Sequence, residues 1–215
     1  FSTMNIYKHR HSVLKSEFST KIRSLKGLSR TSSGRTIKLL ANANTDKEIE
    51  SAKEYGCDGI GLFRTETIYL QQKSLPDENE LYLHVKKALH PAGSMPITVR
   101  VLDIGGDKRL PYLNLGNDIS PFLGLRGIRL LLKNPALLKT QFNVFLKLHQ
   151  EFNLRVLLPM VTLPEELHAV HNIFCECQNE LKPYLRKKTV KIGCMIETPA
   201  SALEIDKFIA LSDFI

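Results

Sequence analysis

Hydrophobic and polar positions alternate along the chain from residue 37 onward in two kinds of segment. Short runs of six or seven mostly apolar residues are typical of strands buried in a parallel sheet. Longer stretches between them carry apolar residues three or four positions apart, which is typical of amphipathic helices. The pattern predicts strands at 37–43, 57–63, 97–102, 154–160 and 190–196, with helices near 48–55, 77–89, 123–132, 135–151 and 165–183.

Several helix starts carry recognisable capping signals. Thr45 with Glu48 has the spacing of a capping box, and Thr162 with Glu165 predicts a cap for a later helix. Pro199 follows a threonine and is typical of the first turn of a helix. These signals support the alternation of strands and helices.

Regular alternation of strands and helices predicts an α/β fold with a parallel sheet. Because no Rossmann fingerprint is present, we expect a (β/α)8 TIM-barrel type rather than a doubly wound sheet. A full barrel needs eight units, and this chain supplies about five and a half, counting residues 213–215 as the start of a sixth strand. The expected barrel is therefore incomplete, and its unpaired strand edges favour association.

The first 34 residues differ from the remainder. A single apolar stripe over residues 5–27 predicts a helix, and a serine- and threonine-rich segment after it predicts a connection. We therefore divide the chain into a basic linker helix with its connection, 1–34, and a partial barrel domain, 35–215.

Basic charge is concentrated at the start of the chain. Residues 1–38 hold nine Lys or Arg against one Glu, whereas the remaining residues hold 21 basic and 21 acidic side chains. A basic arm is compatible with nucleic-acid binding, but few aromatic residues are available to stack on bases. We favour a solvated linker helix and expect no nucleic-acid partner.

Composition indicates an ordinary globular protein, with 43% hydrophobic and 24% charged residues. No apolar run approaches the ~20 residues that span a bilayer, and the first residues lack a signal-peptide pattern, so we expect a cytoplasmic protein without membrane association. The four cysteines form no C-x-x-C pair, and buried reduced thiols are the expected state.

The segment 97–112 carries the strongest chemical signal. Arg100 interrupts a run of β-branched residues, and a buried guanidinium is costly unless an anion pairs with it. The following turn contains Asp103, two glycines and Lys108, and glycines allow backbone N–H groups to face a ligand. Together these features predict one wall of a phosphate site.

Charged residues follow the carboxyl ends of several predicted strands, where barrel proteins place their functional groups. Arg64 follows the second strand, Arg100 lies near the end of the third, and Glu197 follows the fifth. Arg126 opens the helix after the long loop. Converging guanidiniums predict a site for phosphate or carboxylate, and one carboxylate nearby suits Mg²⁺. Roles limited to an ion pair for Glu197, or to covering the rim for Arg126, remain open. The histidines fall on arms or helices and receive no role.

Four segments, residues 59–66, 99–108 with 110–112, 121–126 and 193–200, also carry a family resemblance. Together they resemble the phosphoenolpyruvate-binding barrel of enzyme I of the sugar phosphotransferase system. Pyruvate phosphate dikinase and phosphoenolpyruvate synthase share the Arg-Thr-Glu element and the Glu before Thr-Pro. The Asp-Ile-Gly-Gly-Asp-Lys turn with Leu-Pro-Tyr is similar to enzyme I rather than to those relatives.

The resemblance implies Mg²⁺-dependent transfer of the phosphoryl group of phosphoenolpyruvate (PEP) to a histidine and then to the carrier protein HPr. It implies that Arg64 and Arg100 hold the phosphate, that Arg126 assists, and that Glu197 is one Mg²⁺ ligand. It also implies a homodimer for the full-length protein.

The family's second metal-binding Asp, proton-donating Cys and phosphorylated His have no counterpart here. We therefore assign no catalytic residue and expect no turnover by this chain alone. A non-catalytic binding or dimerisation module, and an enzyme like the dikinase or the synthase, are the alternative interpretations.

Overall fold

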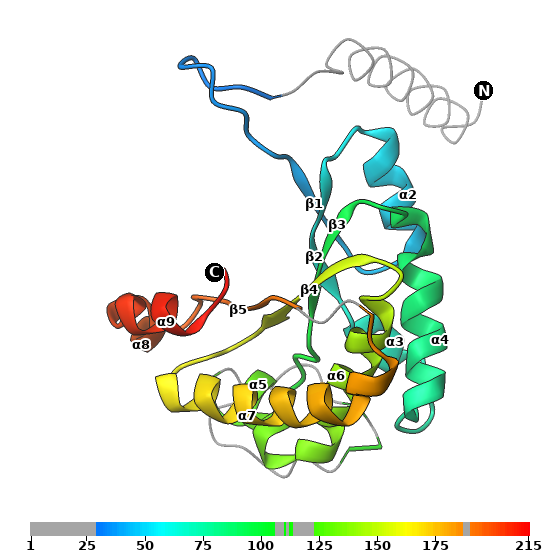
Figure 1. Ribbon diagram of the computed structural model, residues 1–215, viewed down its shortest axis with the longest axis vertical. Helices are drawn as coiled ribbons and strands as arrows, with labels where there is room; N and C mark the ends of the chain where they lie inside the picture. The colour runs from blue at the N-terminus through cyan, green and yellow to red at the C-terminus, as the bar shows by residue number, and fades with distance from the viewer. Residues whose placement is uncertain (1–28, 106–109, 111, 114–122, 187–189) are drawn as a thin grey trace, which may run out of the picture.

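A parallel sheet of five strands forms the centre of the computed structural model, which describes residues 29–105, 110, 112–113, 123–186 and 190–215 (Figure 1). The spatial order of the strands is the same as their order in the sequence, and every neighbouring pair is parallel. The strands are β1 (Leu40–Ala43), β2 (Gly59–Arg64), β3 (Pro96–Arg100), β4 (Asn153–Leu158) and β5 (Ile192–Cys194).

The helices between the strands pack beside one another in chain order, α2 on α4, α4 on α6, α6 on α7 and α7 on α9. In Figure 1 this layer follows one face of the sheet. The helices are α2 (Asp46–Glu54), α3 (Glu66–Leu70), α4 (Glu78–Leu89), α5 (Gly127–Lys133), α6 (Pro135–Leu148), α7 (Pro164–Leu181), α8 (Pro199–Leu203) and α9 (Ile205–Leu211), with short 3-10 turns η1 (His90–Ala92) and η2 (Lys182–Tyr184).

The hydrophobic core lies between the sheet and this helix layer. Ile97 and Val99 of β3 are buried, as are the aromatic side chains of Phe142 and Phe145 on α6. Because side chains alternate along a strand, Thr98 and Arg100 lie on the opposite face of β3. One face of the sheet therefore carries the core, and the other carries polar groups.

The structure confirms an α/β fold with a parallel sheet of five strands. Within the described part of the chain, β1 and β5 do not pair with each other, so the sheet is not closed. The predicted sixth strand is reduced to an isolated parallel bridge between Phe214 and Gly193. The predicted linker helix falls on residues 1–28, outside the described residues.

Two capping predictions need correction. The Thr45 side chain accepts the N–H of Glu48 at 3.3 Å, but the Glu48 carboxylate accepts the N–H of Asn44 rather than that of Thr45. The structure therefore forms half of the predicted capping box.

The predicted cap at Thr162 and Glu165 is wrong, because Pro164 occupies the first turn and moves the cap to Leu163. Glu166 accepts the backbone N–H groups of Thr162 and Leu163, at 2.7 and 3.0 Å.

The cysteines are free thiols, as predicted, but they do not all lie in the core. Cys177 and Cys194 are buried, whereas Cys57 is half-buried and Cys175 is exposed. Burial raises the pKa of the Cys177 thiol to about 11. Among the described helices none is both long enough and apolar enough to cross a membrane.

Candidate functional site

Arg64 and Arg100 lie side by side at the carboxyl edge of the sheet. Each is the last residue of its strand, and the two are register partners between β2 and β3. Parallel strands bring their carboxyl ends to one edge, and this register turns both side chains to the face away from the helices. The structure therefore brings two of the predicted site residues together.

Arg100 is buried and forms ion pairs with two carboxylates. Its side chain Nη2 lies 2.6 Å from Glu66 Oε1, and its Nη1 lies 3.4 Å from Asp103 Oδ2. Arg100, Glu66 and Asp103 are 5%, 4% and 3% exposed, so water screens these charges weakly. The sequence predicted that an anion would pair with Arg100, and the observed anions are side chains of the protein itself.

Glu66 also orders the backbone that follows β3. Its Oε1 accepts the N–H of Asp103 at 3.0 Å, so one carboxylate oxygen joins the Arg100 side chain to the start of the turn. The hydroxyl of the neighbouring Tyr69 is buried and has no hydrogen-bond partner in the part of the chain that the structure describes. Burial raises its pKa, with additional contributions from Tyr112 and the charge of Glu66. Tyr69 is therefore neutral at physiological pH.

Arg126 joins the same cluster through Asp103. Its Nε and Nη2 donate to Asp103 Oδ1 and Oδ2 at 3.2 and 3.0 Å, which is a bidentate pair along one edge of the guanidinium. Arg126 has extended backbone and immediately precedes α5, so the helix predicted from residue 123 begins at Gly127. Asp103 is thus shared between Arg100 and Arg126.

Gly105 allows the turn to approach Arg126 closely. A Cβ at this position would lie 2.4 Å from Arg126 Cβ, and its φ of +134° disfavours any other residue. The sequence predicted that the two glycines expose N–H groups to a ligand. For Gly105 the structure gives close packing as a physical reason, while its neighbour and Lys108 fall among residues 106–109, outside the described part.

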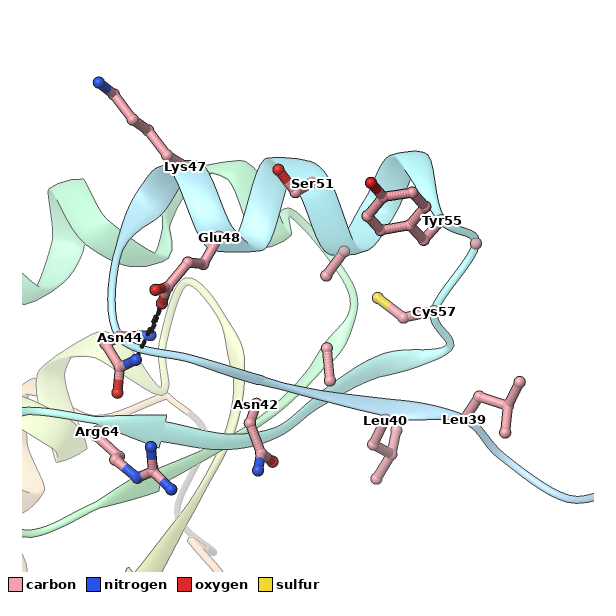
Figure 2. A pocket seen from close by; sticks show the side chains of 13 residues that line it. Leu39, Leu40, Asn42, Asn44, Lys47, Glu48, Ser51, Tyr55, Cys57 and Arg64 are labelled. Atoms are coloured by element: carbon pink, nitrogen blue, oxygen red, sulfur yellow. Dashed lines mark hydrogen bonds between the residues drawn. The ribbon is translucent and has the colours of Figure 1, made fainter. Parts of the chain in front are cut away.

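Arg64 has a different environment. It is half-buried, and among the described residues no carboxylate lies within salt-bridge distance of its guanidinium. It lines one end of an open pocket along β1, and Figure 2 shows its side chain with that of Asn42 on the side of the strands away from α2. The positive charge of Arg64 is therefore available to a ligand on the face of the sheet away from the helices.

Glu197 lies just beyond the carboxyl end of β5, and its carboxylate is exposed. One oxygen accepts the N–H of Met160 at 2.7 Å. Met160 has a left-handed backbone with φ of 58°, and its side chain lies against Gly127, the residue that follows Arg126. On the preceding turn, Met195 Sδ lies 3.8 Å from Arg100 Nη1. Glu197 therefore lies on the same edge as the arginine cluster.

Among the described residues, this edge brings together the guanidiniums of Arg64, Arg100 and Arg126 and the carboxylates of Glu66 and Asp103, so these five side chains carry a net positive charge. Such a site attracts an anion, and phosphate or carboxylate oxygens match the guanidinium donors. No group of three or more potential metal ligands occurs in the described part of the chain. Glu197 supplies a carboxylate, the kind of oxygen ligand that Mg²⁺ prefers.

Sequence reasoning assigned no role to Glu66 and described Asp103 only as part of the turn. A signal for Glu66 was present, since Arg100 required an anionic partner and Glu66 follows the strand next to it. Nothing in the sequence distinguished a partner within the chain from a bound ligand.

Comparison with known proteins gives consistent results. Residues 20–215 match the family model described as PEP-utilising enzyme, PEP-binding domain. Relatives called phosphoenolpyruvate-protein phosphotransferase include one from Streptococcus equinus, 37% identical over 188 residues, which are 86% of this chain and 33% of the relative. Another, from Buchnera aphidicola, is 37% identical over 210 residues, or 94% of this chain and 36% of the relative. The chain spans about a third of the length of these curated relatives.

Proposed function

Because the chain belongs to the family of PEP-utilising enzymes through their PEP-binding domain, we propose that it supplies part of the PEP site of a phosphoenolpyruvate-protein phosphotransferase. The reaction transfers the phosphoryl group of PEP to a histidine and then to HPr, and pyruvate is released. The relatives reported above carry this name rather than that of a dikinase or a synthase, which favours the enzyme I interpretation.

One observation carries the proposal, namely that Arg64, Arg100 and Arg126 lie at one edge of the sheet, where the described side chains carry a net positive charge. In this assignment Arg64 and Arg100 bind phosphate oxygens of PEP, and Arg126 assists. Positive groups held near the transferring phosphoryl group stabilise the charge on its oxygens while the bond between phosphorus and the enol oxygen breaks. Positioning and electrostatics account for this step without a nucleophile from the sheet.

Magnesium fits this site in part. Glu197 is exposed, and its Oε1 accepts the Met160 N–H, so Oε2 is the oxygen that a metal ion could bind. Mg²⁺ in phosphoryl-transfer sites is commonly held by one or two carboxylates together with substrate phosphate oxygens. We propose that Glu197 is one ligand of a Mg²⁺ ion, which when bound would neutralise charge on the phosphoryl oxygens.

We further propose that the open sheet is part of a (β/α)8 barrel, with residues 35–215 as the barrel part and 1–34 as a linker to it. The sequential strand order and the single layer of helices support this proposal, since both are features of barrels. We also propose a cytoplasmic location, homodimer formation and interaction with HPr for the whole protein, because the resemblance of the sequence motifs to enzyme I implies them.

Titration of the 215-residue chain with PEP tests the proposal, with isothermal calorimetry and ³¹P NMR as readouts. Pyruvate and inorganic phosphate serve as comparison ligands, and each series is run with and without MgCl₂. We expect saturable PEP binding that Mg²⁺ strengthens, and we expect Glu197→Gln to remove only the Mg²⁺ effect. If no binding is detected up to about 10 mM PEP, the binding free energy is smaller in magnitude than about 3 kcal/mol, and the proposal for this chain is contradicted.

A further inference from the structure

The two buried carboxylates hold two guanidiniums by different edges. Glu66 holds Arg100 through Nη2 at 2.6 Å, a short charge-assisted hydrogen bond. Asp103 holds Arg126 through Nε and Nη2, and at the same time lies 3.4 Å from Arg100 Nη1. All three contacts are shielded from water, so the guanidinium planes are fixed by the protein.

The contacts of Arg100 are unequal in strength. Strong pairs between guanidinium and carboxylate have N–O distances of about 2.7–2.9 Å, and the Nη1 contact to Asp103, at 3.4 Å, is longer. The other Nη1 contact, at 3.8 Å, is to the thioether sulfur of Met195, which is a weak acceptor. Arg100 Nε and Glu66 Oε2 are both buried and have no hydrogen-bond partner among the described residues. A small rotation that paired these two atoms would complete a bidentate pair and release Nη1, so Nη1 is the nitrogen most easily turned toward a ligand.

We propose that Glu66 and Asp103 are positioning residues, which hold Arg100 and Arg126 in the orientation that binds a phosphoryl group. In this arrangement Glu66 holds the Nη2 side of the Arg100 guanidinium, and Arg100 Nη1 donates to a phosphoryl oxygen. Asp103 aligns Arg126 relative to Arg100. The identity of the ligand rests on the proposed function, whereas the fixing of the guanidiniums rests only on the contacts described above.

A purely neutralising role makes the opposite prediction. If the two carboxylates only lowered the positive charge of the site, removing either charge would strengthen binding of every anion. If they position the arginines, removing either one weakens PEP binding although the site becomes more positive. The direction of the change in affinity therefore separates the two roles.

The test compares Glu66→Gln and Asp103→Asn with the wild-type chain in calorimetric titrations with PEP and with inorganic phosphate. Glu78→Gln is the matched control, because Glu78 forms an ion pair with Lys147 between two helices, on the side of the sheet opposite the arginine cluster. We expect PEP affinity to fall at least about tenfold in each site variant, the value of one charge-assisted hydrogen bond, and to stay unchanged in the control. Unchanged or tighter PEP binding in both site variants overturns the proposal.

Arginine side-chain ¹H–¹⁵N NMR on the ligand-free proteins gives a readout that does not depend on PEP. The Arg100 and Arg126 guanidinium protons are expected to exchange slowly with water in the wild-type chain and rapidly in the site variants. If the wild-type chain fails to bind PEP, the proposed function fails for this chain, and these spectra still decide the positioning role. Equal exchange in wild type and variants overturns it.

Asp103→Glu provides a second variant in case Asp103→Asn does not fold. It keeps the charge but displaces the carboxylate by one methylene group. A positioning role predicts weaker PEP binding here too, whereas wild-type affinity would overturn the role of Asp103.

Discussion

Arg64 and Arg100 are the same residue type at paired positions of neighbouring strands, yet their surroundings differ. Arg100 is 5% exposed and lies against two carboxylates. Arg64 is half-buried, faces the open side of the sheet, and has no carboxylate within salt-bridge distance among the described residues. The end of β3 is therefore a closed and internally neutralised region, and the end of β2 is an open and charged one.

The difference separates two tasks that a phosphate site requires. A buried arginine with fixed partners presents its N–H donors to a ligand in one orientation, because its guanidinium cannot turn freely. The half-buried Arg64, with no carboxylate within salt-bridge distance among the described residues, attracts anions because those residues leave its charge uncompensated. Replacing Arg100 should therefore mainly lower stability, and replacing Arg64 should mainly weaken the affinity for PEP.

The largest expected effect is on stability, at Arg100. Arg100→Met leaves the buried Glu66 and Asp103 carboxylates without this partner, and we expect a loss of about 3–5 kcal/mol in the free energy of unfolding. Arg64→Met should change it by less than about 0.5 kcal/mol, since no buried partner is lost. Urea denaturation followed by circular dichroism measures both values. Equal losses at the two positions would remove the distinction between the regions.

Gly105 is expected to have the next largest effect. Gly105→Ala combines a strained backbone with a clash against Arg126, and we expect a cost of about 2–4 kcal/mol. Gly56→Ala is the control, because its φ is +79° and nothing lies within 4 Å of its Cβ position, so only about 1 kcal/mol of strain is expected. Thermal unfolding of the two variants under identical conditions gives the comparison, and a similar cost for both would exclude the clash.

The third effect concerns affinity and tests the open region. Arg64→Ala should weaken PEP binding about 10- to 100-fold, corresponding to the loss of hydrogen bonds from a charged donor. Arg64→Lys should recover part of the affinity, because it restores the charge but not the planar donor pair. Arg186, which is exposed before the start of β5, provides the control variant Arg186→Ala. Calorimetry should show no loss of affinity for Arg186→Ala.

The smallest effect is expected at a surface ion pair, which sets the scale for the buried one. Burial alone would raise the pKa of Glu78, but hydrogen bonds from Lys147 and Asn143 and the charge of Lys147 outweigh it and lower that pKa below 4.5. Glu78→Gln should cost less than about 1 kcal/mol at pH 7. The lowered pKa means that this contribution is present above about pH 4.5 and is lost as the pH falls through the folded-state pKa. Urea denaturation at pH 7 and pH 3 measures the free energy of unfolding of both proteins. The difference between wild type and Glu78→Gln should be smaller at pH 3 than at pH 7.

Much of the fold followed from the sequence, because apolar runs and amphipathic stretches have different periods. All five strands formed where apolar runs predicted them, although β5 is limited to three residues, Ile192–Cys194. Helix α3 was not predicted, because five residues are too few to show a period of 3.6. The helix predicted from residue 123 begins at Gly127, because the backbone at Arg126 is extended.

The candidate site was predictable in part. Strand ends identified Arg64, Arg100 and Glu197 as residues of one edge, and the need to neutralise a buried Arg100 was predicted from charge alone. The pairing of Asp103 with Arg126 depends on a loop conformation that no local pattern specifies. The contact between Glu197 and the Met160 N–H depends on a left-handed backbone at a residue that seldom adopts it.

That left-handed residue restricts evolution at position 160 in an unusual way. Branching at Cβ, rather than polarity or size, should decide which amino acids are acceptable, because valine, isoleucine and threonine tolerate φ near 58° poorly. Glycine and asparagine satisfy the backbone most easily but give up the thioether side chain that lies on Gly127. Methionine accepts this backbone conformation with less strain than a β-branched residue and still packs its side chain against Gly127. Neighbouring positions with ordinary backbone are not restricted in this way.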